Sequence, residues 1–195
     1  MLSKFKKAIE PRLMFLVHLI PESVGPNALT LVGLLLAAAY LLAVWYRTSP
    51  YLILFLYAVS VVVDAVDGLV ARASGRVSKL GAFLDSTCDR LVDAIHAYSL
   101  YLLGVCAEWE AYVFMVVAYT VSYARARAEG LGLSMSGVGL MERGERVIGV
   151  FLTVTLALFL GAPYARPVFL ALLVLTLITV AQRIAYAARN LGRSE

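Results

Sequence analysis

Four aspartates lie within 26 residues of an otherwise apolar chain: Asp64, Asp67, Asp85 and Asp89. The first two are three residues apart and the last two are four apart, so on helices each pair occupies one face. Closely packed carboxylates repel one another unless a cation lies between them. Oxygen ligands without histidine or cysteine indicate a hard divalent ion such as Mg²⁺, Mn²⁺ or Ca²⁺. Four such acids can bracket two ions, an arrangement suited to phosphoryl-type transfer.

Two glycines and an arginine accompany the aspartates. Gly68 and Gly81 allow a ligand or a neighbouring backbone to approach closely, and Arg72 can hold a phosphate through its planar fork. Each residue also has a purely structural explanation, because glycines form packing notches in membrane helices and arginines anchor their cytoplasmic ends. The chemistry therefore depends on the whole arrangement.

The composition places this acidic stretch in an integral membrane protein. Of the 195 residues, 62% are hydrophobic, and apolar runs of about 20 residues can cross a hydrocarbon core of about 30 Å as helices. Ionisable side chains are costly there, so we interpret the aspartates as functional. The net charge of +4 indicates membrane topology and anionic lipid rather than nucleic acid. Cys88 and Cys106 lie in predicted spans, which argues against disulfides and structural zinc.

We expect an all-α integral membrane fold with six transmembrane helices, preceded by an interfacial amphipathic helix. A single domain would cover residues 1–195, with the interfacial helix at 1–21, bent or broken at Pro11, and the six-helix bundle at 26–190. Prolines 26 and 50 suit the first turns of the first two spans. The expected spans are 26–46, 50–73, 81–106, 111–124, 147–161 and 167–188.

Basic residues orient the spans. With six spans, every Lys and Arg except Arg47 and Arg166 falls on the side of the amino end, which we assign to the cytoplasm. About 13 largely apolar residues precede Asp64 and about 13 follow Asp93, covering about 20 Å in each helix. Both acidic pairs then face each other at one depth in the cytoplasmic half. The sequence predicts a multi-pass protein of the cell membrane with its site facing the cytoplasm.

The complete spacing, Asp-x2-Asp-Gly-x2-Ala-Arg-x8-Gly-x3-Asp-x3-Asp, resembles the signature of the CDP-alcohol phosphotransferase family. The fixed positions are Asp64, Asp67, Gly68, Ala71, Arg72, Gly81, Asp85 and Asp89. The resemblance implies that an alcohol displaces CMP from a CDP-linked lipid at a site with two Mg²⁺ or Mn²⁺ ions. It also implies a homodimer. The lipid can be CDP-diacylglycerol or CDP-archaeol, because apolar spans indicate a hydrophobic environment but do not distinguish ester-linked acyl chains from ether-linked isoprenoid chains.

The resemblance also implies roles for individual residues. Asp64, Asp67 and Asp85 would hold the ions, and Asp89 would take the proton of the acceptor hydroxyl and also touch metal; a carboxylate within hydrogen-bond reach can act in this way. The CDP-binding residues would come from the motif and from the Pro-Asn-x2-Thr start of the first span. They are Gly68, Ala71, Arg72, Gly81, Asn27 and Thr30.

The acceptor is indicated by two basic segments, 122–130 and 141–146. They are similar to segments of prokaryotic phosphatidylinositol phosphate and archaetidylinositol phosphate synthases, which implies inositol 1-phosphate, a phosphorylated polyol. Its phosphate would be bound by Arg125, Arg127, Arg143, Arg146, Arg189 and Arg193. Alternatively these arginines flank membrane spans and pair with nearby glutamates. Phosphatidylglycerophosphate synthases carry similar arginines, so glycerol 3-phosphate is the competing acceptor.

A different class of function is also compatible with acids in a membrane. Transporters of ions or protons use acidic relays, but these are distributed along a pathway or near the midplane. The aspartates here share one depth and are accompanied by Arg72. We therefore favour the transferase and keep the transporter as the alternative.

Overall fold

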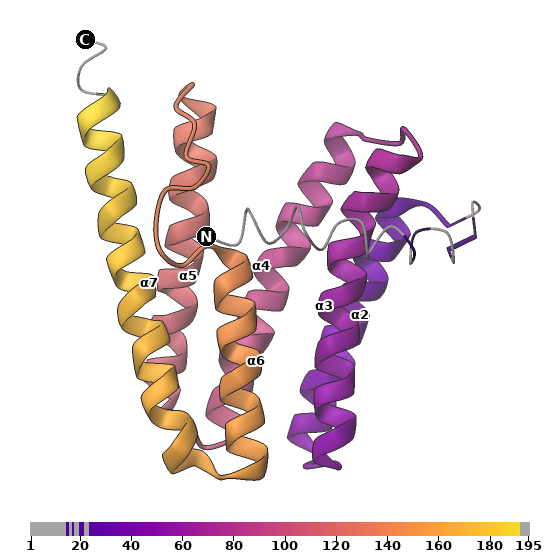
Figure 1. Cartoon of the computed structure of the whole chain (residues 1–195), viewed down its shortest axis with the longest axis vertical. Helices are drawn as coiled ribbons and strands as arrows, with labels where there is room; N and C mark the ends of the chain where they lie inside the picture. Colours follow the sequence, from indigo (N-terminus) through magenta and orange to yellow (C-terminus); the bar gives the residue numbers. More distant parts are fainter. Residues whose placement is uncertain (1–14, 16, 18–19, 22–23, 192–195) are drawn as a thin grey trace. The chain divides into compact units, whose positions relative to one another are not determined.

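The computed structural model describes residues 15, 17, 20, 21 and 24–191. Within them the chain is helical and contains no strand, as expected (Figure 1). The helices are α2 (Pro26–Trp45), α3 (Pro50–Ala73), α4 (Lys79–Leu102), α5 (Glu108–Gly130), α6 (Arg143–Phe159) and α7 (Ala162–Leu191). The interfacial helix expected at 1–21 falls almost entirely outside the described residues. It stays a prediction.

The helices divide into two compact units, with the boundary inside α4 between Ser99 and Leu100. The first unit contains α2, α3 and most of α4, and the second contains the end of α4 with α5, α6 and α7.

The predicted starts of the first two spans are confirmed, because α2 begins at Pro26 and α3 at Pro50. Proline is favoured in the first turn of a helix, where its missing N–H has no partner to lose. The α3 start is also capped, since the Ser49 hydroxyl accepts a hydrogen bond from the Leu52 N–H at 3.2 Å. The residues around Pro26 and Pro50 therefore determine where α2 and α3 begin.

The third helix is shifted relative to the expected range of 81–106. It begins at Lys79, because the Ser78 hydroxyl accepts the Gly81 N–H at 3.0 Å and so caps the first turn. It ends at Leu102, and Gly104 follows with φ of 72°, a left-handed conformation that glycine adopts without strain.

The later helix boundaries also differ from the expected ones. Helix α5 continues to Gly130, so the first basic segment lies on the helix rather than after it, and α6 begins at Arg143 rather than Val147. Helix α7 begins at Ala162 and contains Pro167 in its second turn. A proline that early in a helix removes one backbone hydrogen bond but leaves the later turns intact.

Three helices of the described chain are long and apolar enough to cross a membrane: α2, α3 and α7. Helix α4 is as long as α3 but carries five charged residues in its sequence, and α6 has only 17 residues, the lower end of the usual range for a span. By length and hydropathy, three of the six described helices therefore meet the expectation of membrane-spanning segments.

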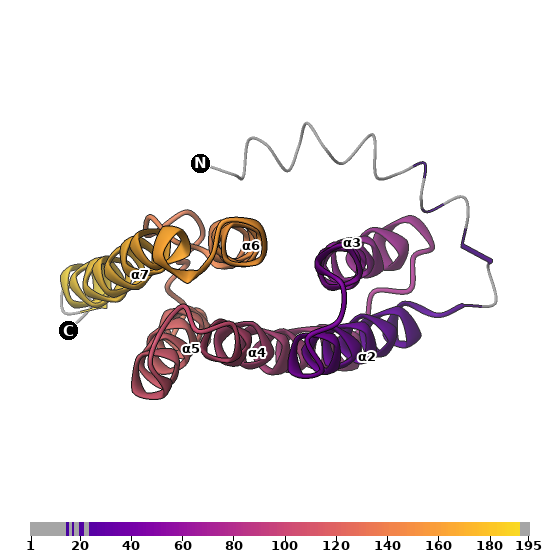
Figure 2. The same ribbon diagram turned by 90° about the horizontal axis from the view of Figure 1, so that it is seen from below.

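Close helix packing occurs within each unit (Figure 2). In the first, α2 lies against α3, and a Cβ on Gly33 would be 3.7 Å from the backbone nitrogen of Asp64. In the second, α6 lies against α7 at Gly149, where any Cβ would collide with the Leu172 side chain. Glycine at position 149 therefore sets how near α6 and α7 approach, whereas at position 33 a Cβ would make ordinary van der Waals contact.

The second unit contains a half-buried ion pair. Arg166 of α7 donates two hydrogen bonds to the Glu110 carboxylate of α5, at 2.5 and 2.7 Å, and a third to the Val105 carbonyl at 3.2 Å. Glu110 is only 5% exposed. Both charges are satisfied, and the pair ties α7 to the connection between α4 and α5.

Candidate active site

Three of the four aspartates form a cluster. Asp64 of α3 and Asp85 and Asp89 of α4 each offer a carboxylate oxygen, and these oxygens all lie within 4.8 Å of one another. All three residues are half-buried. This donor set fits a hard divalent cation, which prefers carboxylate oxygens and would offset the repulsion between the three acids. The facing of the two acidic helices expected from the sequence is therefore present for these three residues.

The fourth aspartate, Asp67, lies beside the cluster but outside this group of oxygens. Its Oδ2 accepts a hydrogen bond from the Thr30 hydroxyl of α2 at 2.5 Å, and the two residues are only 4% and 5% exposed. The expected convergence of four carboxylates is thus a convergence of three, with one carboxylate bonded to α2. Helix α2 packs against α3 closely enough for this bond to form.

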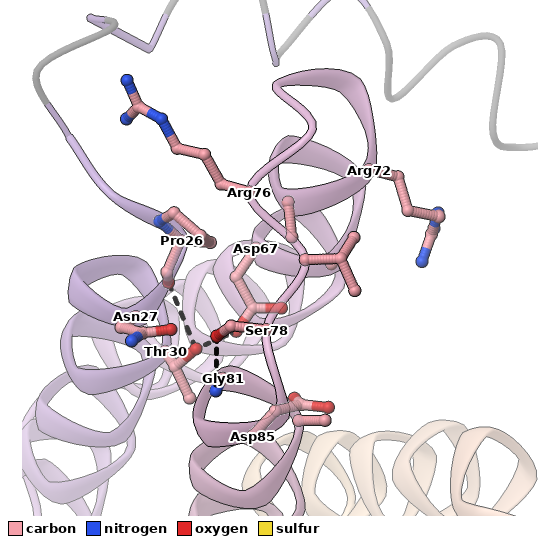
Figure 3. A pocket seen from close by; sticks show the side chains of 13 residues that line it. Pro26, Asn27, Thr30, Asp67, Arg72, Arg76, Ser78, Gly81 and Asp85 are labelled. Carbon is pink, nitrogen blue, oxygen red and sulfur yellow. Dashed lines mark hydrogen bonds between the residues drawn. The ribbon is translucent and has the colours of Figure 1, made fainter.

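A cavity of ≈ 260 Å³ lies next to the cluster (Figure 3). It is formed by the start of α2, the end of α3, the connection between α3 and α4, and the start of α4. Asp67 and Asp85 both line it. All six residues predicted to bind CDP line it as well: Asn27, Thr30, Gly68, Ala71, Arg72 and Gly81.

The cavity also has lining residues that sequence reasoning missed. They are Pro26, Arg76, Val77, Ser78 and Ala82. Most of them fall in or beside residues 73–80, the gap of eight variable positions in the signature. A search for fixed positions alone treats this gap as a simple connection between helices. The signal that would have found them is the shortness of this gap, since a short connection must pass close to both helix ends.

Gly81 has a specific steric role in the cavity wall. A Cβ at this position would lie 2.9 Å from Oδ1 of Asn27 and 3.1 Å from Oγ of Ser78. Atoms of real side chains almost never approach so closely, so a larger residue would displace one of these two neighbours. Gly81 therefore lets α4 begin directly beside the start of α2.

Charges of both signs border the cavity. Asp67 and Asp85 supply carboxylates, while Arg72 and Arg76 supply guanidinium groups on exposed side chains. A nucleoside diphosphate fits this combination, because guanidinium groups bind phosphate oxygens directly and a cation held by the acids would bind others. Asp89, the predicted base, accepts a hydrogen bond from the neighbouring Arg90 at 3.1 Å.

The arginines predicted to bind the acceptor lie in the second unit or beyond the described residues. Arg125 and Arg127 are exposed on α5, and Arg125 pairs with Glu129 at 2.9 Å. At the start of α6 Arg143 is half-buried, whereas Arg146 is 3% exposed and donates to the Met141 carbonyl at 3.3 Å.

Arg189 is exposed near the end of α7, and Arg193 lies outside the described residues. Pairing with glutamate, the alternative explanation of these arginines, is therefore present at Arg125.

One buried arginine was missed by the sequence analysis. Arg183 of α7 is 2% exposed, and it donates to the Val138 carbonyl at 2.9 Å and to the Val121 carbonyl at 2.6 Å. Its guanidinium also lies 3.6 Å from the Glu142 carboxylate. The only sequence signal is a basic residue within the last apolar segment.

Neighbouring α7 residues hold the same connection between α5 and α6. The Thr179 hydroxyl accepts the Met141 N–H at 2.9 Å, and the Gln182 side chain accepts the Leu140 N–H at 3.1 Å. With Arg183, one face of α7 thus binds the backbone that leads into α6.

Comparison with known proteins gives a family and a relative that agree with each other. Residues 23–187 match the family model for CDP-alcohol phosphatidyltransferase. An archaetidylinositol phosphate synthase of Aeropyrum pernix is 42% identical over 184 residues, which cover 92% of this chain and 89% of that protein.

Two solved structures of the Mycobacterium tuberculosis phosphatidylinositol phosphate synthase resemble this chain. One, with CDP-DAG bound, has a TM-score of 0.75 at 26% identity and covers 93% of this chain and 94% of that one. The other, in complex with manganese and citrate, has a TM-score of 0.74 at 27% identity and covers 91% and 87%. With the family model matching most of its length, the chain belongs to the CDP-alcohol phosphatidyltransferase family.

Proposed function

We propose that this protein transfers the lipid phosphate moiety of a CDP-linked lipid to a hydroxyl of inositol phosphate and releases CMP. The observation that carries this proposal is Asp85, which belongs both to the carboxylate cluster and to the wall of the cavity. A diphosphate bound in the cavity would therefore lie beside the acids. The chain is an enzyme of the CDP-alcohol phosphotransferase class, and the proposal adds substrates and residue roles.

The acids have two proposed tasks. Asp64, Asp67 and Asp85 hold two Mg²⁺ or Mn²⁺ ions, which neutralise diphosphate oxygens when bound and make CMP a better leaving group. The tight three-oxygen cluster supports a metal site at Asp64, Asp85 and Asp89. Asp67 contributes from its place beside Thr30, whose hydroxyl orients its carboxylate.

Asp89 is the proposed general base and also touches metal. It takes the proton from the acceptor hydroxyl as that oxygen bonds to the lipid-side phosphorus. The bond between this phosphorus and the bridging oxygen breaks, and CMP leaves with that oxygen. Gly68, Ala71, Arg72, Gly81, Asn27 and Thr30 bind the CDP portion, a role supported by their shared place in the cavity wall.

The acceptor is proposed to be inositol 1-phosphate. The name of the Aeropyrum pernix relative and those of the two solved structures support an inositol phosphate product. Its phosphate would be bound by Arg125, Arg127, Arg143, Arg146, Arg189 and Arg193. The exposed guanidinium groups of Arg125 and Arg127 are accessible to a soluble anion.

The proposed setting is a cell membrane with the active site facing the cytoplasm. Residues 1–195 form one membrane domain, with an interfacial helix at 1–21 and six spans at 26–190, and two copies form a homodimer. The three long apolar helices support membrane insertion. A cytoplasmic site brings the soluble acceptor and the lipid headgroup together.

The test is a CMP-release assay with the purified protein in lipid and detergent. CDP-diacylglycerol and CDP-archaeol are each combined with inositol 1-phosphate, glycerol 3-phosphate, serine or free inositol, with Mg²⁺, Mn²⁺ or a chelator. We expect CMP only with metal and fastest with inositol 1-phosphate. CMP release that no acceptor accelerates contradicts the transferase, and faster release with glycerol 3-phosphate supports the competing acceptor.

A further inference from the structure

A second polar layer lies deeper in the first unit than the carboxylates. It consists of Tyr40 of α2, Tyr57 of α3, and His96 and Ser99 of α4, which we call the register layer. These side chains are 0%, 1%, 2% and 0% exposed, respectively. Each of the three helices that form the cavity contributes to it.

Directional contacts connect the register layer across the helices. The Tyr40 hydroxyl donates to Oγ of Ser99 at 2.7 Å, and the Ser99 hydroxyl donates to the His96 carbonyl at 2.8 Å. The rings of Tyr57 and His96 stack with centroids 4.3 Å apart, and the Tyr57 hydroxyl lies 3.4 Å from Nδ1 of His96. Tyr40 meets the Tyr57 ring edge-on at 5.1 Å.

The register layer lies one heptad from the carboxylate level on every helix. Tyr57 precedes Asp64 by seven residues, and His96 follows Asp89 by seven. On α2, Tyr40 follows Gly33 by seven, and Gly33 packs against the backbone at Asp64. Seven residues are about two turns and about 10 Å, so the two levels share one helix face.

We propose that the register layer is a positioning device for the metal site, because it fixes the lengthwise register of α2, α3 and α4. Apolar packing alone tolerates sliding of one helix along another, whereas a buried hydrogen-bonded layer matches its partners in one register only. Sliding by a fraction of a turn would separate Asp64 from Asp85 and Asp89. Tyr40, Tyr57, His96 and Ser99 thus act through the carboxylates, without touching substrate.

This inference depends on the proposed function in one respect, that the carboxylates hold a divalent ion. The experiment therefore measures Mn²⁺ binding directly, with purified protein in detergent and no substrate, from the spin-resonance signal of free Mn²⁺. His96→Leu removes the ring stack, and Tyr40→Phe removes one hydroxyl. The matched control is Phe169→Leu, which alters an equally buried aromatic residue of α7 whose ring meets that of Phe114 in α5 edge-on.

We expect His96→Leu to weaken Mn²⁺ binding about tenfold, as loss of a supporting group around a metal site does. Tyr40→Phe should weaken it about threefold, the range for one buried hydrogen bond. Phe169→Leu should lower the melting temperature and leave Mn²⁺ affinity unchanged. The double variant Tyr40→Phe/Ser99→Ala should weaken Mn²⁺ binding by less than the sum of the two single variants, because both changes break the Tyr40–Ser99 bond, while Ser99→Ala also removes the bond to the His96 carbonyl within α4.

Unchanged Mn²⁺ affinity in both single variants, with melting temperatures lowered as in the control, overturns the positioning role. If His96→Leu does not fold, Tyr40→Phe decides the question by itself, since it changes no packing volume. Absence of Mn²⁺ binding in the unaltered protein is a different result, because it contradicts the proposed metal site and removes the basis of the register layer with it.

Discussion

The acid-lined cavity and the connection held by α7 use charged residues in opposite ways. Around the cavity, Asp64, Asp85 and Asp89 crowd together, an arrangement that costs stability unless a cation is bound. Around the connection, Arg183 donates to two carbonyls of the protein itself and lies 3.6 Å from a carboxylate. One region carries crowded charges that a bound cation would balance, and in the other the charge is bound by the chain itself.

This difference separates functional from structural charges in a membrane protein. A buried charge whose partners are all protein groups stabilises an arrangement, whereas clustered like charges beside a cavity indicate a missing counter-ion. Residue type alone does not distinguish them, because both regions contain charged residues within largely apolar segments.

The largest effect is expected from the acids. Asp89→Asn should lower kcat by about 10³-fold, within the usual contribution of a general base, and Asp85→Asn should also weaken Mn²⁺ binding. The measurements are CMP release and direct Mn²⁺ titration. Glu108→Gln, an exposed acid at the start of α5, is the control and should match the unaltered protein. Full activity in Asp89→Asn rejects it as the base.

Arg183→Met should destabilise the protein, because it leaves Glu142 and two carbonyls without their buried cationic partner. The loss of two buried hydrogen bonds and of a partly exposed ion pair should cost about 1–3 kcal/mol, measured as a lower melting temperature in detergent. Arg125→Met removes an exposed pair and should cost only about 0.3–0.5 kcal/mol. If the two variants have the same melting temperature, Arg183 does not stabilise the connection between α5 and α6 as its contacts indicate.

Gly81→Ala should raise KM for the CDP-lipid by about tenfold, equal to about 1.4 kcal/mol. The added methyl group would displace Asn27 or Ser78 from the cavity wall. Gly130→Ala is the matched control, since a Cβ there meets nothing within 4 Å. A KM that stays constant in Gly81→Ala places the CDP portion elsewhere.

The smallest effect is expected from a single acceptor arginine. Arg127→Gln should raise KM for inositol 1-phosphate about fivefold and leave KM for the CDP-lipid unchanged, because several arginines share the phosphate. Arg47→Gln changes an exposed arginine assigned to the opposite side of the membrane and should alter neither constant. An equal response of both variants would remove Arg127 from the acceptor site.

Much of the cavity could be predicted from the sequence because its residues are close together along the chain. The signature positions lie at the facing ends of two consecutive helices joined by a short connection, so local geometry brings them together. Prolines 26 and 50 likewise determined where α2 and α3 begin. The extent of α5 was not predictable, because its last basic turns resemble a polar connection.

The sequence by itself determined the membrane class, the acidic motif and the helices that carry it, since these depend on composition and on spacing within one or two helices. Only the tertiary structure decided that Asp67 bonds to Thr30, 37 residues away, while the other three acids gather. It alone identified the partners of Arg183, which lie 45 and 62 residues from it. Contacts at such separations depend on how helices pack, and helical periodicity does not specify packing partners.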